Sequence, residues 1–186
     1  GVETLEDLGP NWSSYFINAY PLKIEYLSVN ESEQLIRNPD PDSKFSLEYS
    51  DEAVNKILDL TRGHPYLIQL LCSIVVDFVN EYRTSVATGD IVEMAHQKAM
   101  EAGELYFRNV WDEFVGVDEE SIFHGRALLR QTALEPLPVD QLPNVPGISV
   151  ALERLVHLMI LEQKDGFLYH QVPLIGDWVL NRAPVE

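Results

Sequence analysis

The sequence of 186 residues contains one cysteine, Cys72. A single cysteine cannot build an internal disulfide framework or a cysteine zinc site, and such sparing use is typical of a reducing, cytoplasmic compartment. Cys72 lies in a strongly apolar stretch, residues 67–79. We therefore expect it to be a small buried core residue and not a reactive thiol.

Long hydrophobic runs are also missing. No stretch approaches the roughly 20 apolar residues that a membrane span needs, and the opening segment GVETLEDLGPNW is polar, unlike a signal peptide. We expect no membrane association. Because the sequence starts at Gly1 and not at a methionine, we also expect it to be part of a longer protein.

Positive charge is scarce. Thirty acidic residues face 13 basic ones, for a formal net charge of −17. The imbalance is spread along the chain: residues 1–114 carry 20 acidic and 8 basic residues, and residues 115–186 carry 10 and 5. Because non-specific binding to nucleic acids depends on Lys and Arg, this composition makes such binding unfavourable.

The motifs of common active sites are absent. There is no phosphate loop of the form GxxxxGK followed by Ser or Thr, and no GxGxxG, HExxH or GxSxG. The five histidines, at positions 64, 96, 124, 157 and 170, have no metal-ligand spacing. The acidic run 118–120 is best explained as charge at a helix N-terminus. We predict no catalytic residue and no metal site.

What is present indicates a globular, mainly α protein, with 46% apolar and 10% aromatic residues. A short amphipathic element over 11–20 precedes an expected strand in which Leu22, Ile24 and Tyr26 alternate with polar residues. Ser28 and Glu31 have the spacing of a capping box and predict a helix that ends before a proline. Further helices are expected over 51–62, 65–82 and about 90–114.

The segment LTRGHPYLIQLLC interrupts two of these helices with Gly63, His64 and Pro65. Glycine is expected just past a helix end, and proline suits the first turn of the next helix. The simplest interpretation is a corner between two packed helices. That interpretation accounts for Gly63 and Pro65 but does not require His64.

After residue 117 the pattern changes. Helices are predicted over 118–133 and 149–159, then a hairpin whose strands ILEQ and FLYH are joined by KDG, and a last amphipathic helix over 173–182. Helices followed by a hairpin predict a winged helix-turn-helix domain. The expected fold is therefore a helical bundle followed by a winged helix with a small β-hairpin.

Four segments occur in a familiar order: GVETLEDLGPNWSSYF, LKIEYLSVNESEQLIRNP, ILDLTRGHPYLIQLLC and the predicted winged helix. Together they resemble the C-terminal portion of AAA+-related signalling ATPases, in particular the STAND group and its archaeal-ATPase-like relatives. The resemblance implies that residues 1–29 end the nucleotide-binding core with its last strand, that residues 30–114 form a helical lid, and that residues 115–186 form the winged-helix domain.

The resemblance also implies a site. Gly63, His64 and Pro65 match the Gly-x-Pro motif of the lid, which lies against the adenine and ribose of bound ATP or ADP in that family. Arg62 could reach a phosphate, although an exposed Arg at a helix end is the simpler interpretation. The phosphate loop and the Mg²⁺-binding acid would lie upstream of Gly1, and without them this sequence should not hydrolyse ATP by itself.

These expectations describe the lid and winged-helix region of a cytoplasmic, nucleotide-dependent signalling switch, whose partners are its own N-terminal ATPase core and another protein. One alternative is a transcription regulator that reads DNA with its winged helix. The helix over 149–159 argues against that role, because it carries one Arg and one Glu, the hairpin adds a single Lys, and residues 115–186 have a net charge of −5. A second alternative is a protein-interaction domain without a ligand.

Overall fold

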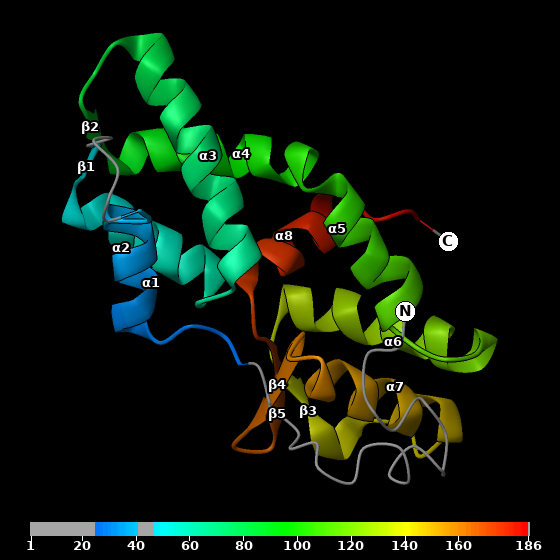
Figure 1. Ribbon diagram of the computed structural model, residues 1–186. Helices are drawn as coiled ribbons and strands as arrows, with labels where there is room; N and C mark the ends of the chain where they lie inside the picture. Colours follow the sequence, from blue (N-terminus) through cyan, green and yellow to red (C-terminus); the bar gives the residue numbers. More distant parts are fainter. Residues whose placement is uncertain (1–24, 41–46, 186) are drawn as a thin grey trace, which may run out of the picture.

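The structure is a computed structural model that describes residues 25–40 and 47–185 (Figure 1). This part of the chain is mainly helical, with one two-stranded and one three-stranded sheet. The elements are α1 (Val29–Arg37), β1 (Glu48–Tyr49), α2 (Asp51–Thr61), α3 (Pro65–Tyr82), β2 (Val86–Ala87), α4 (Gly89–Ala102), α5 (Glu104–Asn109), α6 (Glu119–Leu134), β3 (Leu137–Pro138), α7 (Pro146–His157), β4 (Leu161–Lys164), β5 (Phe167–His170) and α8 (Pro173–Asn181). The predicted mainly α class is confirmed.

The start of the chain is described only in part. The amphipathic element expected over 11–20 and most of the strand expected to follow it, including Leu22 and Ile24, lie outside the described residues. The end of that expected strand, residues 25–28, is not in a strand. The predicted division at residues 29 and 114 stays a prediction.

Helices α1 to α5 form the first group of helices, which we call the N-terminal bundle. The predicted caps are present: Ser28 and Glu31 form a capping box at α1, and the Ser50 side chain accepts a hydrogen bond from Ala53 N at the start of α2. Helix α3 packs against α1, α2 and α4, and its apolar face is buried at Leu67, Ile68, Leu71, Ile74, Val75 and Val79. The parallel pair β1–β2 joins the segment before α2 to the segment after α3.

The helix expected over about 90–114 is interrupted. Helix α4 ends at Ala102, α5 begins after Gly103, and a π-helix follows over Val110–Phe114. A Cβ at Gly103 would lie 2.7 Å from the Phe107 ring and 2.9 Å from a methyl of Leu70. The glycine therefore allows close packing at this break, which directs the buried side chains of Phe107 and Trp111 inward.

Residues 119–185 form the second group, the C-terminal unit, with α6, α7 and α8 around a sheet of order β3–β5–β4. The predicted hairpin is confirmed: β4 and β5 are antiparallel, with Lys164 opposite Phe167. Its turn residues Asp165 and Gly166 have positive φ values of 51° and 81°, as a tight two-residue hairpin turn requires.

Helix α8 lies between the N-terminal bundle and the rest of the C-terminal unit (Figure 1). Trp178 is fully buried and stacks on Phe107 of α5 with ring centroids 5.7 Å apart. Its indole N–H donates to Glu104 Oε2 at 2.9 Å, and Arg182 forms an ion pair with Glu101 at 2.6 Å. The last helix of the chain is thus part of the interface between the two groups.

Within residues 25–40 and 47–185, no helix is both long enough and apolar enough to cross a membrane.

Candidate functional site

The predicted corner between α2 and α3 is a tight turn in which Gly63 is sterically required. Arg62 adopts a left-handed conformation with φ 46°, and Gly63 follows with φ 85°. A Cβ at Gly63 would lie 2.2 Å from the carbonyl oxygen of Leu27. Only glycine satisfies both the backbone conformation and this close approach.

The segment that enters the described part of the chain is attached directly to this corner. Leu27 N–H donates to Gly63 O at 2.9 Å. The first described residues of the chain are therefore fixed to the corner.

His64 is the N-cap of α3, a role that the sequence did not reveal. Its Nδ1 accepts from Leu67 N–H at 3.5 Å, so in the neutral ring Nε2 carries the hydrogen and donates to the Tyr106 hydroxyl at 2.8 Å. Burial lowers the pKa of His64 to about 4, so the ring is neutral at pH 7. Both ring nitrogens are therefore used within the protein, and Pro65 occupies the first turn as predicted.

Three tyrosines surround His64, and we call these four residues the corner cluster. The His64 ring centroid lies 4.8 Å from that of Tyr26, 5.3 Å from that of Tyr106 and 6.5 Å from that of Tyr66. The Tyr26 hydroxyl donates to Met159 O at 2.9 Å. Burial raises the pKa of Tyr26 to about 12 and also raises the pKa of Tyr106, so both hydroxyls remain protonated, Tyr26 as a donor to Met159 O and Tyr106 as the acceptor of the His64 hydrogen bond.

Tyr26 is the residue that links three parts of the molecule. It belongs to the entering segment, its ring packs on the corner, and its hydroxyl binds the turn between α7 and β4 of the C-terminal unit. Tyr26 and Tyr106 are 38 and 42 residues from His64 in the sequence. No local pattern marks them as partners of the corner, which is why sequence reasoning missed them.

A cavity of about 470 Å³ with a mixed polar and apolar lining lies beside the corner. Arg62 is on its wall, with a side chain 56% exposed and 3.3 Å from Asp59. Ser32 also contributes to the wall, and its buried hydroxyl has no hydrogen-bond partner in the described structure. The full lining is Leu27, Val29, Ser32, Asn55, Leu58, Asp59, Arg62 and Gly63. The polar part of this lining combines the exposed Arg62 guanidinium, the Asp59 carboxylate that pairs with it and the Asn55 amide, groups that could hold a polar ligand.

The structure therefore brings the four predicted site residues, Arg62, Gly63, His64 and Pro65, together at one point but gives them different tasks. Gly63 makes the close approach to the entering segment, His64 is committed to internal hydrogen bonds, and Arg62 is available at the cavity. A direct contact with a ligand would come from Arg62 and the backbone of the corner, not from the ring nitrogens of His64.

A second cavity, of about 300 Å³, lies between α1 and α3 and is mainly apolar. Cys72 lines it beside Tyr49, and burial raises the pKa of the Cys72 thiol to about 11. A thiol with that pKa is protonated and unreactive at neutral pH, which agrees with the expected structural role. Within the described ranges, no group of three or more His, Cys, Asp or Glu side chains could hold a metal ion.

The arginines of the C-terminal unit make internal contacts. Arg126 donates to Trp111 O and to Asp112, Arg154 donates to Phe114 O, Arg130 stacks on the Trp111 ring and binds Pro184 O, and Arg182 pairs with Glu101. These contacts hold the unit against the π-helix and the N-terminal bundle. Among the five basic residues over 115–186, only Lys164 has no such contact in the described part of the chain.

Comparison with known proteins gives little. No family model matches the chain, and no curated protein matches it significantly. Solved structures of Thermotoga maritima RuvB, one of them described as a Holliday junction branch migration motor, match with a TM-score of 0.39 and 23% identity over 80% of this chain. This weak structural similarity involves an AAA+ ATPase, and the matched region covers 48% of the RuvB chain.

Proposed function

We propose that this chain is the lid and winged-helix region of an ATP/ADP-dependent signalling switch. Residues 30–114 would act as the lid and residues 115–186 as a winged-helix output domain. The catalytic parts, a phosphate loop and a Mg²⁺-binding acid, would be supplied by an N-terminal core of the same protein. On this proposal the region is regulatory and does not catalyse a reaction by itself.

The observation that carries the proposal is the position of the corner, at the meeting point of three parts. The entering segment is bonded to Gly63 through Leu27, and Tyr26 connects the corner to Met159 in the C-terminal unit. A nucleotide bound between a core and this corner would therefore lie next to Tyr26, which connects the lid to the C-terminal unit. Exchange of ADP for ATP would then change how firmly the C-terminal unit is held.

Within this proposal, Arg62 contacts the nucleotide and His64 positions the corner. Arg62 is exposed beside this cavity, where a guanidinium can pair with a phosphate in a bidentate geometry. His64 caps α3 and binds Tyr106, so its removal would loosen the corner without removing a ligand contact.

The test is titration of fluorescent ADP into the protein together with its upstream sequence. Arg62→Ala should weaken binding by roughly tenfold, the loss of one charge-assisted contact. Arg83→Ala is the matched control, because Arg83 also ends a helix in the left-handed conformation, is exposed, and lies at the other end of α3. Equal affinities for both variants would remove the corner from the nucleotide site.

A protein-contact role for the C-terminal unit is supported by the use of its arginines. Four of its five basic residues are engaged in internal contacts, which leaves few cations for a phosphate backbone. The alternative of an interaction domain without a ligand has a separate test, the melting temperature with and without ADP. A ligand that binds only the folded protein raises that temperature, so equal values would favour this alternative.

A further inference from the structure

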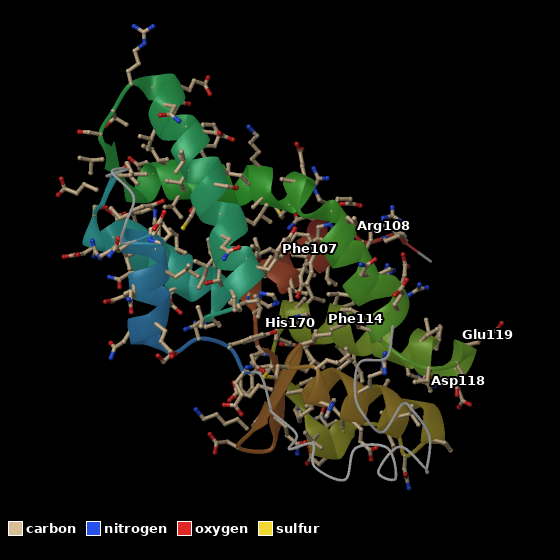
Figure 2. The ribbon with its side chains drawn as sticks, viewed as in Figure 1. Phe107, Arg108, Phe114, Asp118, Glu119 and His170 are labelled. Carbon is tan, nitrogen blue, oxygen red and sulfur yellow. The ribbon has the colours of Figure 1, made fainter. Side chains whose placement is uncertain are left out.

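A third cavity, of about 300 Å³, lies in the C-terminal unit, far in sequence from the corner. It is formed by the last turn of α6, the end of β5 and the first turn of α8, and we call it the α6-end cavity. Its lining is Thr132, Ala133, Leu134, Glu135, Pro136, Tyr169, His170, Pro173, Gly176 and Asp177. Figure 2 labels His170 near the place where α6 and α8 approach each other.

His170 lines this cavity and has one ring nitrogen without a hydrogen-bond partner. Its Nε2 lies 2.9 Å from Leu129 O, and because a carbonyl can only accept, Nε2 carries the hydrogen. The other nitrogen, Nδ1, is buried and has no hydrogen-bond partner in the described structure. Burial lowers the pKa of His170, so the ring is neutral at pH 7 and Nδ1 presents a lone pair.

The two carboxylates of the lining bring negative charge to the cavity, and the Thr132 hydroxyl is already used as a donor to Leu128 O. Glu135 is the C-cap of α6 and Asp177 belongs to α8, and Asp177 Oδ2 lies 3.0 Å from His96 Nε2. The C-terminal end of α6 also lines the cavity, and the helix dipole is negative at that end. The lining contains no Lys or Arg.

Donors for an anion are scarce at the same place. Helix α8 begins there, but its first residue is Pro173, which has no N–H, and the N–H groups of Ile175 and Gly176 are bonded to Val172 O. A buried acceptor without a partner is destabilising. A donor with positive charge would satisfy both the acceptor and the carboxylates.

We propose that the α6-end cavity binds a protonated amine or guanidinium group, as carried by a Lys or Arg side chain of a protein partner. The cavity is large enough for the end of one such side chain, and the net charge of −17 attracts a basic partner over a longer range. This proposal is independent of the nucleotide site, because no residue of the corner lines this cavity.

The test uses methylguanidinium as the probe and methylurea as its neutral analogue of the same shape, in an NMR titration of the protein. Methylguanidinium should cause saturable shifts of the Ala133 and Gly176 amides, and the ¹⁵N signal of His170 Nδ1 should move as it accepts a hydrogen bond. N-acetylarginine amide should reproduce these shifts if the site suits a protein side chain. Equal shifts with methylurea would overturn the role of charge.

The matched variants separate this site from general attraction to an acidic protein. Glu135→Gln with Asp177→Asn should weaken methylguanidinium binding at least fivefold. Asp140→Asn with Glu162→Gln removes the same charge from the same unit outside the cavity, and binding should be unchanged. Equal weakening in both pairs would show only diffuse electrostatic attraction. If Asp177→Asn unfolds the protein through loss of the His96 contact, Glu135→Gln alone should weaken binding about twofold or more, and no weakening would overturn the proposal.

Discussion

At the scale of single residues, Gly63 is the position on which the corner depends. Replacing it with Ala should destabilise the protein by at least about 3 kcal/mol, because the new Cβ would meet the Leu27 carbonyl in addition to the cost of a positive φ. Gly166→Ala is the control: its φ of 81° is similar, but nothing lies within 4 Å of its Cβ, so the loss should be about 1 kcal/mol. Urea unfolding measures both. Equal losses would mean that the approach of residue 27 does not constrain the corner.

His64 should make stability depend on pH. Burial lowers its folded pKa from 6.5 to about 4, so the unfolded chain binds more protons between these values and stability falls as pH decreases from about 6.5 towards 4. The contribution lost at pH 4.5 should be about 2–3 kcal/mol.

The measurement is urea unfolding at pH 7 and pH 4.5 for the wild type and for His64→Asn. Asn is a good N-cap that does not titrate, and His170 and the carboxylates are common to both proteins. The wild type should therefore lose more stability between the two pH values than His64→Asn. Parallel losses would contradict the assignment of the low pKa to His64.

At the scale of elements, α8 should contribute strongly to the stability of the whole chain. Trp178→Ala removes a fully buried ring from the interface with α5 and should cost about 3–5 kcal/mol. Trp178→Phe keeps an aromatic ring but leaves Glu104 Oε2 without its indole donor, and should cost about 1–2 kcal/mol. Leu180→Ala, on the same helix at a side chain 44% exposed, should stay within about 0.5 kcal/mol. If the three variants unfold alike in urea, α8 is not part of the interface core.

Local patterns in the sequence predicted the helix caps and turns, but they could not predict contacts between residues that are far apart in the chain. Capping residues at Ser28 and Ser50, the Gly63–Pro65 corner and the turn at Gly166 depend on neighbours a few residues away, so their patterns are readable. The break at Gly103 was missed, since its cause is the packing of Phe107 and Leu70 around a missing side chain. The partners of His64, Tyr26 and Tyr106, were missed because they lie 38 and 42 residues away in the sequence and meet it only in the folded chain.

At the scale of the whole molecule, the arginine contacts to the π-helix and two further connections join the two groups of helices. Helix α8 packs its tryptophan against α5, and Tyr26 binds the turn after α7. The corner is next to the second connection and far in sequence from the first. A change at the corner would therefore act on the C-terminal unit through Tyr26, while α8 keeps the two groups together.

The distribution of charge over the whole molecule predicts that it does not bind DNA, even though its C-terminal unit combines helices with a hairpin. Four of the five basic residues in that unit have internal partners, and the net charge of −17 repels a phosphate backbone. Fluorescence anisotropy of a labelled duplex at low salt should show no binding up to about 100 µM protein, where non-specific DNA-binding proteins already bind. Glu153→Lys with Glu162→Lys places cations on α7 and on the hairpin, and this variant should bind measurably, with an affinity that falls as salt rises. Binding by the wild type with that salt dependence would favour the transcription regulator. It would mean that the arginines of the C-terminal unit leave their internal partners to bind phosphate.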